Sequence, residues 1–446
     1  MALSGIQIYK LLPQTNCKEC GFPTCLAFAM KLAAKQVELS ACPYVTEESK
    51  AQLAESSAPP IHLVSLKSNG YEVKAGNEVV MYRHEKTFYN KPGLFVRVLD
   101  SETPADIQAK IAQLNAFKVN YVGIDLSVDG FAVASVSGNA GAFASAVKAV
   151  RQSSQRPLIL MSRDAQIMAA GLEALQGETP LLYGADADNW EAMAGLAKQH
   201  HTALGVIANS LESLADLTEK IKAKGVEDLV IDPGGRSFGQ ALTLGTQIRR
   251  LSIKKNYRPL GFPVISFPGD AGNPGLEAML AAQSIAKYAG FIVVDTASPA
   301  TLYPLLVLRQ NIYTDPQKPI QVQPGVYEIN NPKPEDPVLV TTNFSITYFS
   351  VANEVEGSGL PAWLVVADAE GMSVLTAWAA GKFDAERIAK AIKGFNVADK
   401  ISRKRIVIPG HVAVLSGELE EELPGWEIRV GPREAVDLPA FMKQVL

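Results

Sequence analysis

The chain has 446 residues, of which 47% are hydrophobic and 20% charged, and this predicts two or three domains with sizeable buried cores. Its formal net charge of −4 argues against a nucleic-acid partner, which usually requires a basic surface. No apolar run reaches the roughly 18 residues of a membrane span. The first ten residues show no basic region followed by an apolar stretch, so we expect no secretory signal and a cytoplasmic protein with no membrane partner.

The first segment, residues 1–58, contains two stretches of helical pattern, residues 4–12 and 24–37. Ser4 is placed to cap the first helix, and Pro13 follows its end. The segment closes with the breaker run SSAPP. We predict a small domain of two helices joined by a loop.

All four cysteines fall in this segment, as Cys17-x2-Cys20-x4-Cys25 followed by Cys42. Clustered cysteines in a cytosolic chain indicate a metal site rather than a disulfide framework. One short-spaced set with a distant fourth thiolate favours a 4Fe-4S cluster. A zinc site is the alternative, although zinc usually uses two short knuckles. We expect the apolar neighbours Phe22, Leu26 and Phe28 to shield the cluster.

Short strands follow at residues 61–66 and 78–89, with turn signals between them, and lead into the next domain. Eight apolar, β-branched runs then recur with helical patterns between them, at residues 94–99, 121–126, 157–161, 180–184, 203–207, 228–232, 262–266 and 290–294. Eight strand–helix units predict a TIM barrel within residues 59–314. An open, doubly wound sheet is the alternative.

Three of these barrel strands end at or near an aspartate, Asp125, Asp232 and Asp295. Catalytic residues of TIM barrels lie at such strand ends. A pterin-binding site in the barrel therefore stays open as an alternative role for this domain.

Residues 315–337 contain six prolines and predict an extended interdomain linker. Residues 338–446 predict a second, doubly wound α/β domain, with strands at 337–342, 362–368, 405–410 and 426–430. Glycines follow three of these strand ends, at Gly371, Gly410 and Gly431. Because ligands of open α/β sheets lie beyond the carboxyl ends of the strands, we expect these glycines to let the backbone approach a bulky ligand.

Three stretches, residues 6–33, 340–383 and 408–435, resemble the large (gamma) subunits of corrinoid iron-sulfur proteins. The resemblance covers nearly the whole chain. It implies a 4Fe-4S domain, a TIM barrel and a corrinoid-binding α/β domain in a heterodimer with a small subunit. It also implies a methyl carrier of the acetyl-CoA (Wood–Ljungdahl) pathway, which accepts methyl on Co(I) from methyltetrahydrofolate through a methyltransferase and delivers it to carbon monoxide dehydrogenase/acetyl-CoA synthase. The cluster would reactivate Co(II), with electrons from a reductive activator or a ferredoxin.

The resemblance assigns the cluster ligands to Cys17, Cys20, Cys25 and Cys42. It also implies a set of cobamide-binding residues around the strand ends of the C-terminal domain: Val340, Thr341, Thr342, Ile346, Thr347, Glu370, Gly371, Met372, Ser373, Gly431 and Arg433.

The run DAEGMS, residues 368–373, lacks the histidine with which many cobamide proteins bind cobalt from below. A missing lower ligand favours four-coordinate Co(I), so we expect a base-off cobamide. Two other functions stay open, a pterin-binding barrel methyltransferase and an electron-transfer protein that carries only the cluster.

Overall fold

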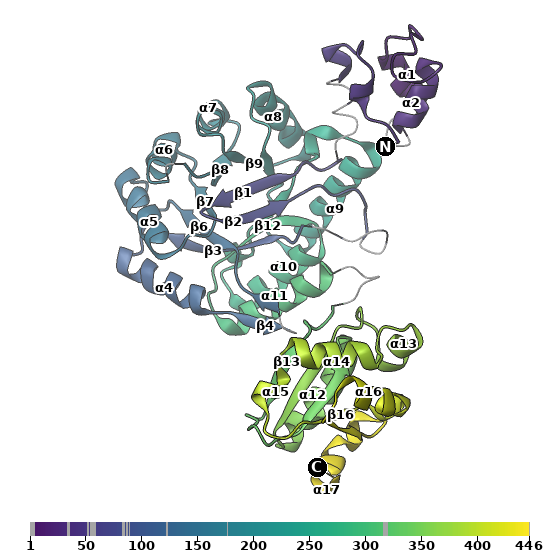
Figure 1. Cartoon of the computed structure of the whole chain (residues 1–446). Coiled ribbons are helices and arrows are strands. Elements are labelled where there is room, and N and C mark those ends of the chain that lie inside the picture. The colour runs from purple at the N-terminus through teal and green to yellow at the C-terminus, as the bar shows by residue number, and fades with distance from the viewer. Residues whose placement is uncertain are drawn as a thin grey trace. The chain divides into compact units, whose positions relative to one another are not determined.

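The structure is a computed structural model that describes residues 5–33, 36–50, 53, 59–82, 85, 88, 90–121, 124–175, 177–314 and 320–445. The chain forms two compact units, Met1–Phe117 with Ser127–Tyr313, and Lys118–Leu126 with Thr314–Leu446 (Figure 1). Among the described residues, no helix has both the length and the hydropathy that crossing a bilayer requires.

The N-terminal segment is built from α1 (Gly5–Leu11), α2 (Cys25–Ala33) and the short helix η1 (Leu39–Ala41). The two α-helices pack closely, since a Cβ added at Gly5 would lie 2.3 Å from Met30 Sδ. Ile8 and Phe28 are buried in the core of the segment. Ser4, the expected cap of α1, lies outside the described residues.

A β-hairpin precedes the barrel, with β1 (Val64–Ser68) paired antiparallel to β2 (Tyr71–Ala75). Asn69 and Gly70 form its turn with φ values of 42° and 88°, as tight hairpin turns require. The prediction of a strand at 78–89 is wrong for the described part of that range, residues 78–82, 85 and 88, which has no strand. The second strand instead uses the residues between the two turn signals.

Eight parallel strands form a closed barrel, which confirms the TIM-barrel prediction over the open sheet. In barrel order from the first strand in sequence they are β3 (Gly93–Leu99), β6 (Gly130–Ala134), β7 (Leu158–Met161), β8 (Leu181–Ala185), β9 (Ala203–Ile207), β10 (Leu229–Asp232), β11 (Val264–Ser266) and β12 (Ala289–Val294). The hairpin side chains Val64, Leu66 and Val73 share a buried core with Phe95 and Phe291 of the barrel interior.

Helices surround the barrel strands (Figure 1). They are α4 (Pro104–Ala116), α5 (Ala140–Ser153), α6 (Ala165–Glu173), α7 (Trp190–His200), α8 (Leu211–Ala223), α9 (Phe238–Lys255), α10 (Pro274–Ala286) and α11 (Pro299–Ile312), with short turns η2 (Arg258–Leu260) and η3 (Pro268–Ala271). Side chains such as Thr103, Asn139, Asp164 and Ser210 accept hydrogen bonds from the first turn of the helix that follows each of them.

Seven of the eight predicted barrel strands are present, and the second is wrong. Tyr121 and residues 124–126 instead lie in a two-stranded antiparallel pair, β4 (Val119–Tyr121) with β5 (Ile124–Leu126), in the second compact unit. There the ring of Tyr121 lies 6.5 Å from that of Phe349. The true second strand is β6, whose sequence GFAVA is fully buried but has a weak β-branched signal. Asp125 is therefore not at a barrel strand end.

The C-terminal domain is a five-stranded sheet in the order β13-β15-β14-β16-β17, with β13 antiparallel and the rest parallel. Its strands are β13 (Gly325–Ile329), β14 (Val338–Thr342), β15 (Ala362–Ala367), β16 (Arg405–Ile408) and β17 (Glu427–Val430). The linker prediction is wrong for residues 325–329, which form the edge strand β13. The prolines of the stretch lie outside this strand, as a hydrogen-bonded ladder requires.

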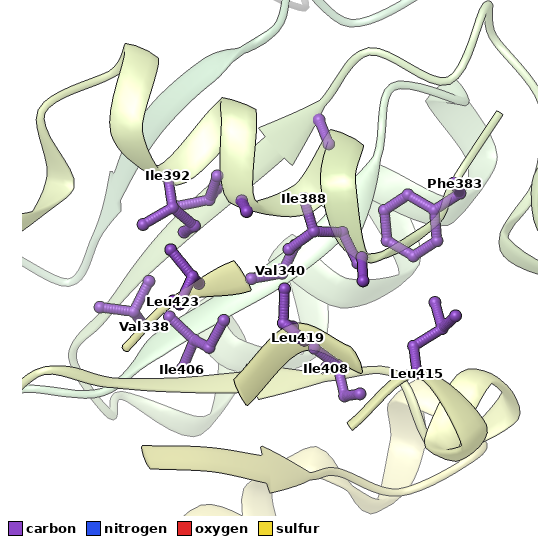
Figure 2. Packing of buried hydrophobic residues seen from close by; sticks show 14 of the residues in the cluster. Val338, Val340, Phe383, Ile388, Ile392, Ile406, Ile408, Leu415, Leu419 and Leu423 are labelled. Atoms are coloured by element: carbon purple, nitrogen blue, oxygen red, sulfur yellow. The ribbon is translucent and has the colours of Figure 1, made fainter. Parts of the chain in front are cut away.

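Helices cover both faces of this sheet. They are α12 (Ser345–Ser358), α13 (Val374–Ala379), α14 (Ala385–Gly394), α15 (Val397–Lys400), α16 (Ser416–Glu422) and α17 (Leu438–Val445), with η4 (Gly410–Leu415) and η5 (Ala435–Asp437). Val338 and Val340 face the buried cluster that contains Ile388 and Leu419 (Figure 2), whereas Leu339 faces the cluster on α12 and α17. The period-two alternation thus places α14 and α16 on one face and α12 and α17 on the other.

Candidate functional site

The cysteines lie on a loop and a helix start in the N-terminal segment. Cys25 is the first residue of α2 and is buried with Cys42 in the same apolar core, with Cys20 partly buried against it and Cys17 exposed. Of the three residues expected to shield the cluster, Phe28 is fully buried in this core, Phe22 is partly buried and Leu26 is exposed. Their shielding of a cluster stays a prediction.

The backbone of the cysteine loop has an unusual conformation. Gln14, Asn16 and Lys18 have positive φ values of 59°, 48° and 68°, and Gly21 has 82°. Residues other than glycine rarely adopt this region, and such sites often mark function. Backbone turns of this kind point N–H groups into a concave surface, which suits anionic groups including iron-sulfur clusters.

Two hydrogen bonds hold Asn16 against Cys25. The Asn16 side-chain Oδ1 accepts from the backbone N–H of Cys25 at 2.8 Å, and the backbone N–H of Asn16 donates to Cys25 Sγ at 3.4 Å. A third bond, from the Tyr44 hydroxyl to Glu19 Oε1 at 2.8 Å, ties the Cys17–Cys20 turn to the residues that follow Cys42. This bond raises the pKa of Tyr44 above its ordinary value.

The donor set fits an iron-sulfur cluster. Thiolates are the ligands that such clusters use, and the described residues contribute four of them from one loop, one helix start and one distant turn. Within the described ranges, no three His, Cys, Asp or Glu side chains gather to hold a single metal ion. A cubane differs from such an ion because each thiolate binds a separate iron.

A cavity of about 770 Å³ opens in the C-terminal domain, beyond the carboxyl ends of β14 and β16 and against the start of α12. This is the edge at which open α/β sheets bind ligands. Seven predicted cobamide residues line it: Val340, Thr341, Ile346, Thr347, Ser373, Gly431 and Arg433. The tertiary structure therefore brings together residues that are distant in sequence. Val340 and Arg433, for example, are 93 positions apart.

The Thr341 side chain supplies an unused polar group at this cavity. Its hydroxyl is fully buried and has no hydrogen-bond partner among the described residues, and the same is true of Thr342. An unpaired buried hydroxyl costs stability, so such a group calls for an explanation. Thr341 lines the cavity, whereas Thr342 does not.

Four predicted residues do not line the cavity: Thr342, Glu370, Gly371 and Met372. The loop after β15 is instead tied to Asn343, a buried residue that sequence analysis missed. Asn343 Oδ1 accepts hydrogen bonds from the backbone N–H groups of Ala369 and Gly371, both at 2.9 Å. A polar residue directly after a buried strand was the signal for it.

Further residues of α12, beyond the predicted Ile346 and Thr347, also line the cavity. Ser350 and Glu354 lie three and seven residues after Thr347 on one helical face, a periodicity that would have indicated them. His411 lines the cavity as well, with Nε2 3.9 Å from Glu434 Oε1.

The glycines at the strand ends let two segments of the chain pack closely against each other. They do not leave space for a ligand at these points. A Cβ at Gly410 would lie 2.5 Å from the carbonyl oxygen of Gly431, and one at Gly371 would lie 2.6 Å from Gln321 Nε2. Their expected role in ligand approach is not supported by these contacts, although Gly431 does line the cavity.

The predicted aspartates of the barrel mouth are paired with arginines. Arg97 binds both carboxylate oxygens of Asp295 at 2.7 and 2.8 Å, and Arg236 binds those of Asp232 at 3.0 and 2.7 Å. Asp270 links the two arginines through its two oxygens. Burial alone would lower the pKa of Arg236, but the hydrogen bonds with Asp232 outweigh it and raise that pKa. The network satisfies the acidic groups internally.

Comparison with known proteins gives matches along nearly all of the chain. Residues 63–442 match the family model of the CO dehydrogenase/acetyl-CoA synthase delta subunit, and residues 12–44 match the model of an Fe-S cluster family. The "Corrinoid/iron-sulfur protein large subunit" of Moorella thermoacetica is 43% identical over 443 residues, covering 99% of both chains. The "Acetyl-CoA decarbonylase/synthase complex subunit gamma" of Methanopyrus kandleri is 35% identical, covering 99% of this chain and 98% of its own.

Among solved structures, a dihydropteroate synthase from Thermus thermophilus, in complex with 6HMPPP, covers 55% of this chain and 98% of its own. Its TM-score is 0.40 and its sequence identity 15%.

Proposed function

Because this chain belongs to the family of corrinoid/iron-sulfur protein large subunits, we propose that it is the large subunit of a methyl carrier in the acetyl-CoA pathway. The observation that carries the proposal is the cavity at the carboxyl edge of the C-terminal sheet, with an unpaired buried hydroxyl on its wall, in a chain that also has the cysteine loop. A bound cobamide would supply the cobalt that accepts and releases the methyl group.

The residues that line the cavity have separate roles in this proposal. Thr341 and Thr347 offer hydroxyls to the polar edge of the corrin, and Arg433 offers a positive charge to an anionic substituent. Ile346 is 65% exposed beside the cavity and can cover apolar surface of the macrocycle. The residues of the Asn343-bound loop, Glu370 to Met372, remain predictions for the cofactor.

The cysteine loop is proposed to hold a 4Fe-4S cluster through all four thiolates. Its contribution would be one-electron reduction of Co(II), formed by accidental oxidation, back to Co(I). A reductive activator or a ferredoxin would donate that electron. A single cluster transfers one electron, which matches the one-electron difference between these cobalt states.

The cobamide is proposed to be base-off, without a protein ligand below cobalt. The loop of residues 368–373 carries no histidine, and His411 is the histidine to test because it lines the cavity. We expect the EPR spectrum of the Co(II) form to lack nitrogen hyperfine splitting in both the native protein and His411→Ala. A splitting that disappears in His411→Ala would contradict the base-off proposal.

The partners proposed are a small subunit, a methyltetrahydrofolate methyltransferase and carbon monoxide dehydrogenase/acetyl-CoA synthase. Support comes from the relatives, whose names describe a large subunit and a subunit of an acetyl-CoA decarbonylase/synthase complex. A pterin-binding barrel is disfavoured, because Asp232 and Asp295 are already bound by arginines.

The test is reconstitution of the anaerobically prepared chain with its small subunit and cobamide. We expect corrin absorption, about four irons per chain, and transfer of methyl from methyltetrahydrofolate only when the methyltransferase is added. Binding of methyltetrahydrofolate by this chain alone would favour the barrel alternative. Iron without corrinoid would reduce the function to electron transfer.

A further inference from the structure

Cys25 differs from the other cysteines because two hydrogen bonds connect it to one residue, Asn16. The side-chain Oδ1 of Asn16 accepts from the Cys25 backbone N–H at 2.8 Å, while the Asn16 backbone N–H donates to Cys25 Sγ at 3.4 Å. The two bonds close a ring between the loop and the start of α2. The Asn16 side chain therefore fixes the distance between the Asn16 backbone N–H and Cys25 Sγ.

The conformation of Asn16 is the one that this ring requires. Its φ of 48° lies in the left-handed region, which costs most residues energy but which asparagine tolerates better than others. The strain is retained although Asn16 itself is exposed, so the two bonds to Cys25 offset it.

We propose that Asn16 is a positioning residue that raises the reduction potential of the cluster by holding an N–H···S hydrogen bond on Cys25. The proposal rests on the function proposed above, in which Cys25 is a cluster ligand. Hydrogen bonds to the sulfurs are one of the factors that set the potential of an iron-sulfur cluster. A donor favours the reduced form because that form carries one more negative charge on the cluster and its ligands.

The test is the midpoint potential of Asn16→Gly, measured by EPR-monitored redox titration of the loaded protein. Glycine keeps the backbone N–H and can adopt the positive φ without strain, but it removes the Oδ1 that fixes the ring. We expect the variant to hold its iron and to favour the oxidised cluster about tenfold more than the native protein, which is a shift of about 59 mV to lower potential for one electron.

The matched control is Gln14→Gly, two residues earlier in the same loop. Gln14 also has a positive φ, of 59°, but its side chain bonds the carbonyl oxygen of Tyr9 rather than a cysteine. We expect its potential to equal that of the native protein. A native potential in Asn16→Gly, or equal shifts in the two variants, would overturn the proposal.

If Asn16→Gly takes up no iron, Asn16→Asp decides, because its carboxylate can still accept from the Cys25 N–H. Iron uptake restored by aspartate supports the positioning role, and no restoration overturns it. Failure of the native protein itself to hold iron would instead refute the proposed function, so the two failures are distinguishable.

Discussion

At the residue scale, the candidate sites contain polar groups whose partners are unusual or absent. Thr341 and Thr342 are adjacent on β14, both are fully buried, and neither hydroxyl has a partner among the described residues. Only Thr341 lines the cavity. A substitution of Thr341 therefore tests the cavity, and the same substitution of Thr342 is its control on the same strand.

We expect Thr341→Val to weaken cobamide binding about five- to tenfold, because a hydrogen bond contributes about 1–1.5 kcal/mol. Thr342→Val should leave the affinity nearly unchanged. Equilibrium titration followed by corrin absorption measures both. Without cofactor, both variants should be at least as stable as the native chain, because each removes an unsatisfied buried group. Equal loss of affinity in the two variants would contradict the assignment of Thr341.

Asp100, at the end of β3, is a second residue whose surroundings predict a measurable effect. Its carboxylate accepts from the backbone N–H groups of Val136 and Ser137, both at 2.9 Å, and from the hydroxyls of Ser135 and Ser137. Burial alone would raise the pKa of Asp100, but these bonds outweigh it and hold the pKa below its ordinary value of 3.8.

Because the folded-state pKa is lowered, the unfolded chain takes up the proton first as pH falls. The stabilisation by Asp100 is therefore full above about pH 4–5 and is lost as pH drops through the folded-state pKa, below 3.8. We expect Asp100→Asn to cost about 1 kcal/mol of unfolding free energy at pH 7, and nothing once the native carboxylate is protonated. Urea unfolding at several pH values measures it, with the exposed Asp188→Asn as control. A pH-independent cost would contradict this origin.

At the scale of elements, strands with a strong β-branched pattern were predictable and the others were not. The run of residues 228–232 forms strand β10, as predicted. The sequence GFAVA, which forms β6, was not predicted to be a strand. Small residues pack well inside a barrel but carry little β signal. Strand β13 was not predicted either. The prolines on both sides of it indicated a linker, but its pairing with β15 makes it part of the sheet.

Hydrogen exchange distinguishes an edge strand from a linker. β13 pairs with β15 from Gly325↔Val366 to Ile329↔Ala362. We expect amides of residues 325–329 that donate into this ladder to exchange at least roughly 100-fold more slowly than in an unstructured peptide of the same sequence. Mass spectrometry or NMR of the full chain measures it. Exchange at the unstructured rate throughout 325–329 would restore the linker interpretation.

At the scale of the whole molecule, the two compact units have separate buried cores. The barrel unit has its core inside the eight strands, and the C-terminal unit has one on each face of its sheet. The segment Lys118–Leu126 interrupts the first unit in sequence but belongs to the second unit. Its Tyr121 packs against the core that contains Val355. All residues that line the 770 Å³ cavity belong to the second unit.

Because the cavity is confined to one unit, cobamide should stabilise that unit alone. We expect calorimetry of the isolated chain to show two unfolding transitions, of which cobamide raises one. At about 100 times its dissociation constant, the ligand should add about 2.7 kcal/mol to the unfolding free energy of that unit. Thr341→Val should reduce the shift. Equal shifts of both transitions would contradict binding confined to the second unit.

The sequence by itself determined the barrel, the parallel strands of the C-terminal sheet and the cysteine set. These depend on local patterns, namely burial of successive residues in a strand, helical periodicity and the spacing of thiols. Seven of the predicted cofactor residues line one cavity, because strand ends in a parallel sheet meet at one edge.

Only the tertiary structure decided the remaining features, since they depend on partners distant in sequence. Asn343 binds a loop 26 residues away at Ala369, and Arg97 binds Asp295 across the barrel mouth. The paired strands β4 and β5 belong to the second unit, where the ring of Tyr121 packs against that of Phe349. No local pattern records such pairings, because their free energy arises only when the chain has brought both partners together.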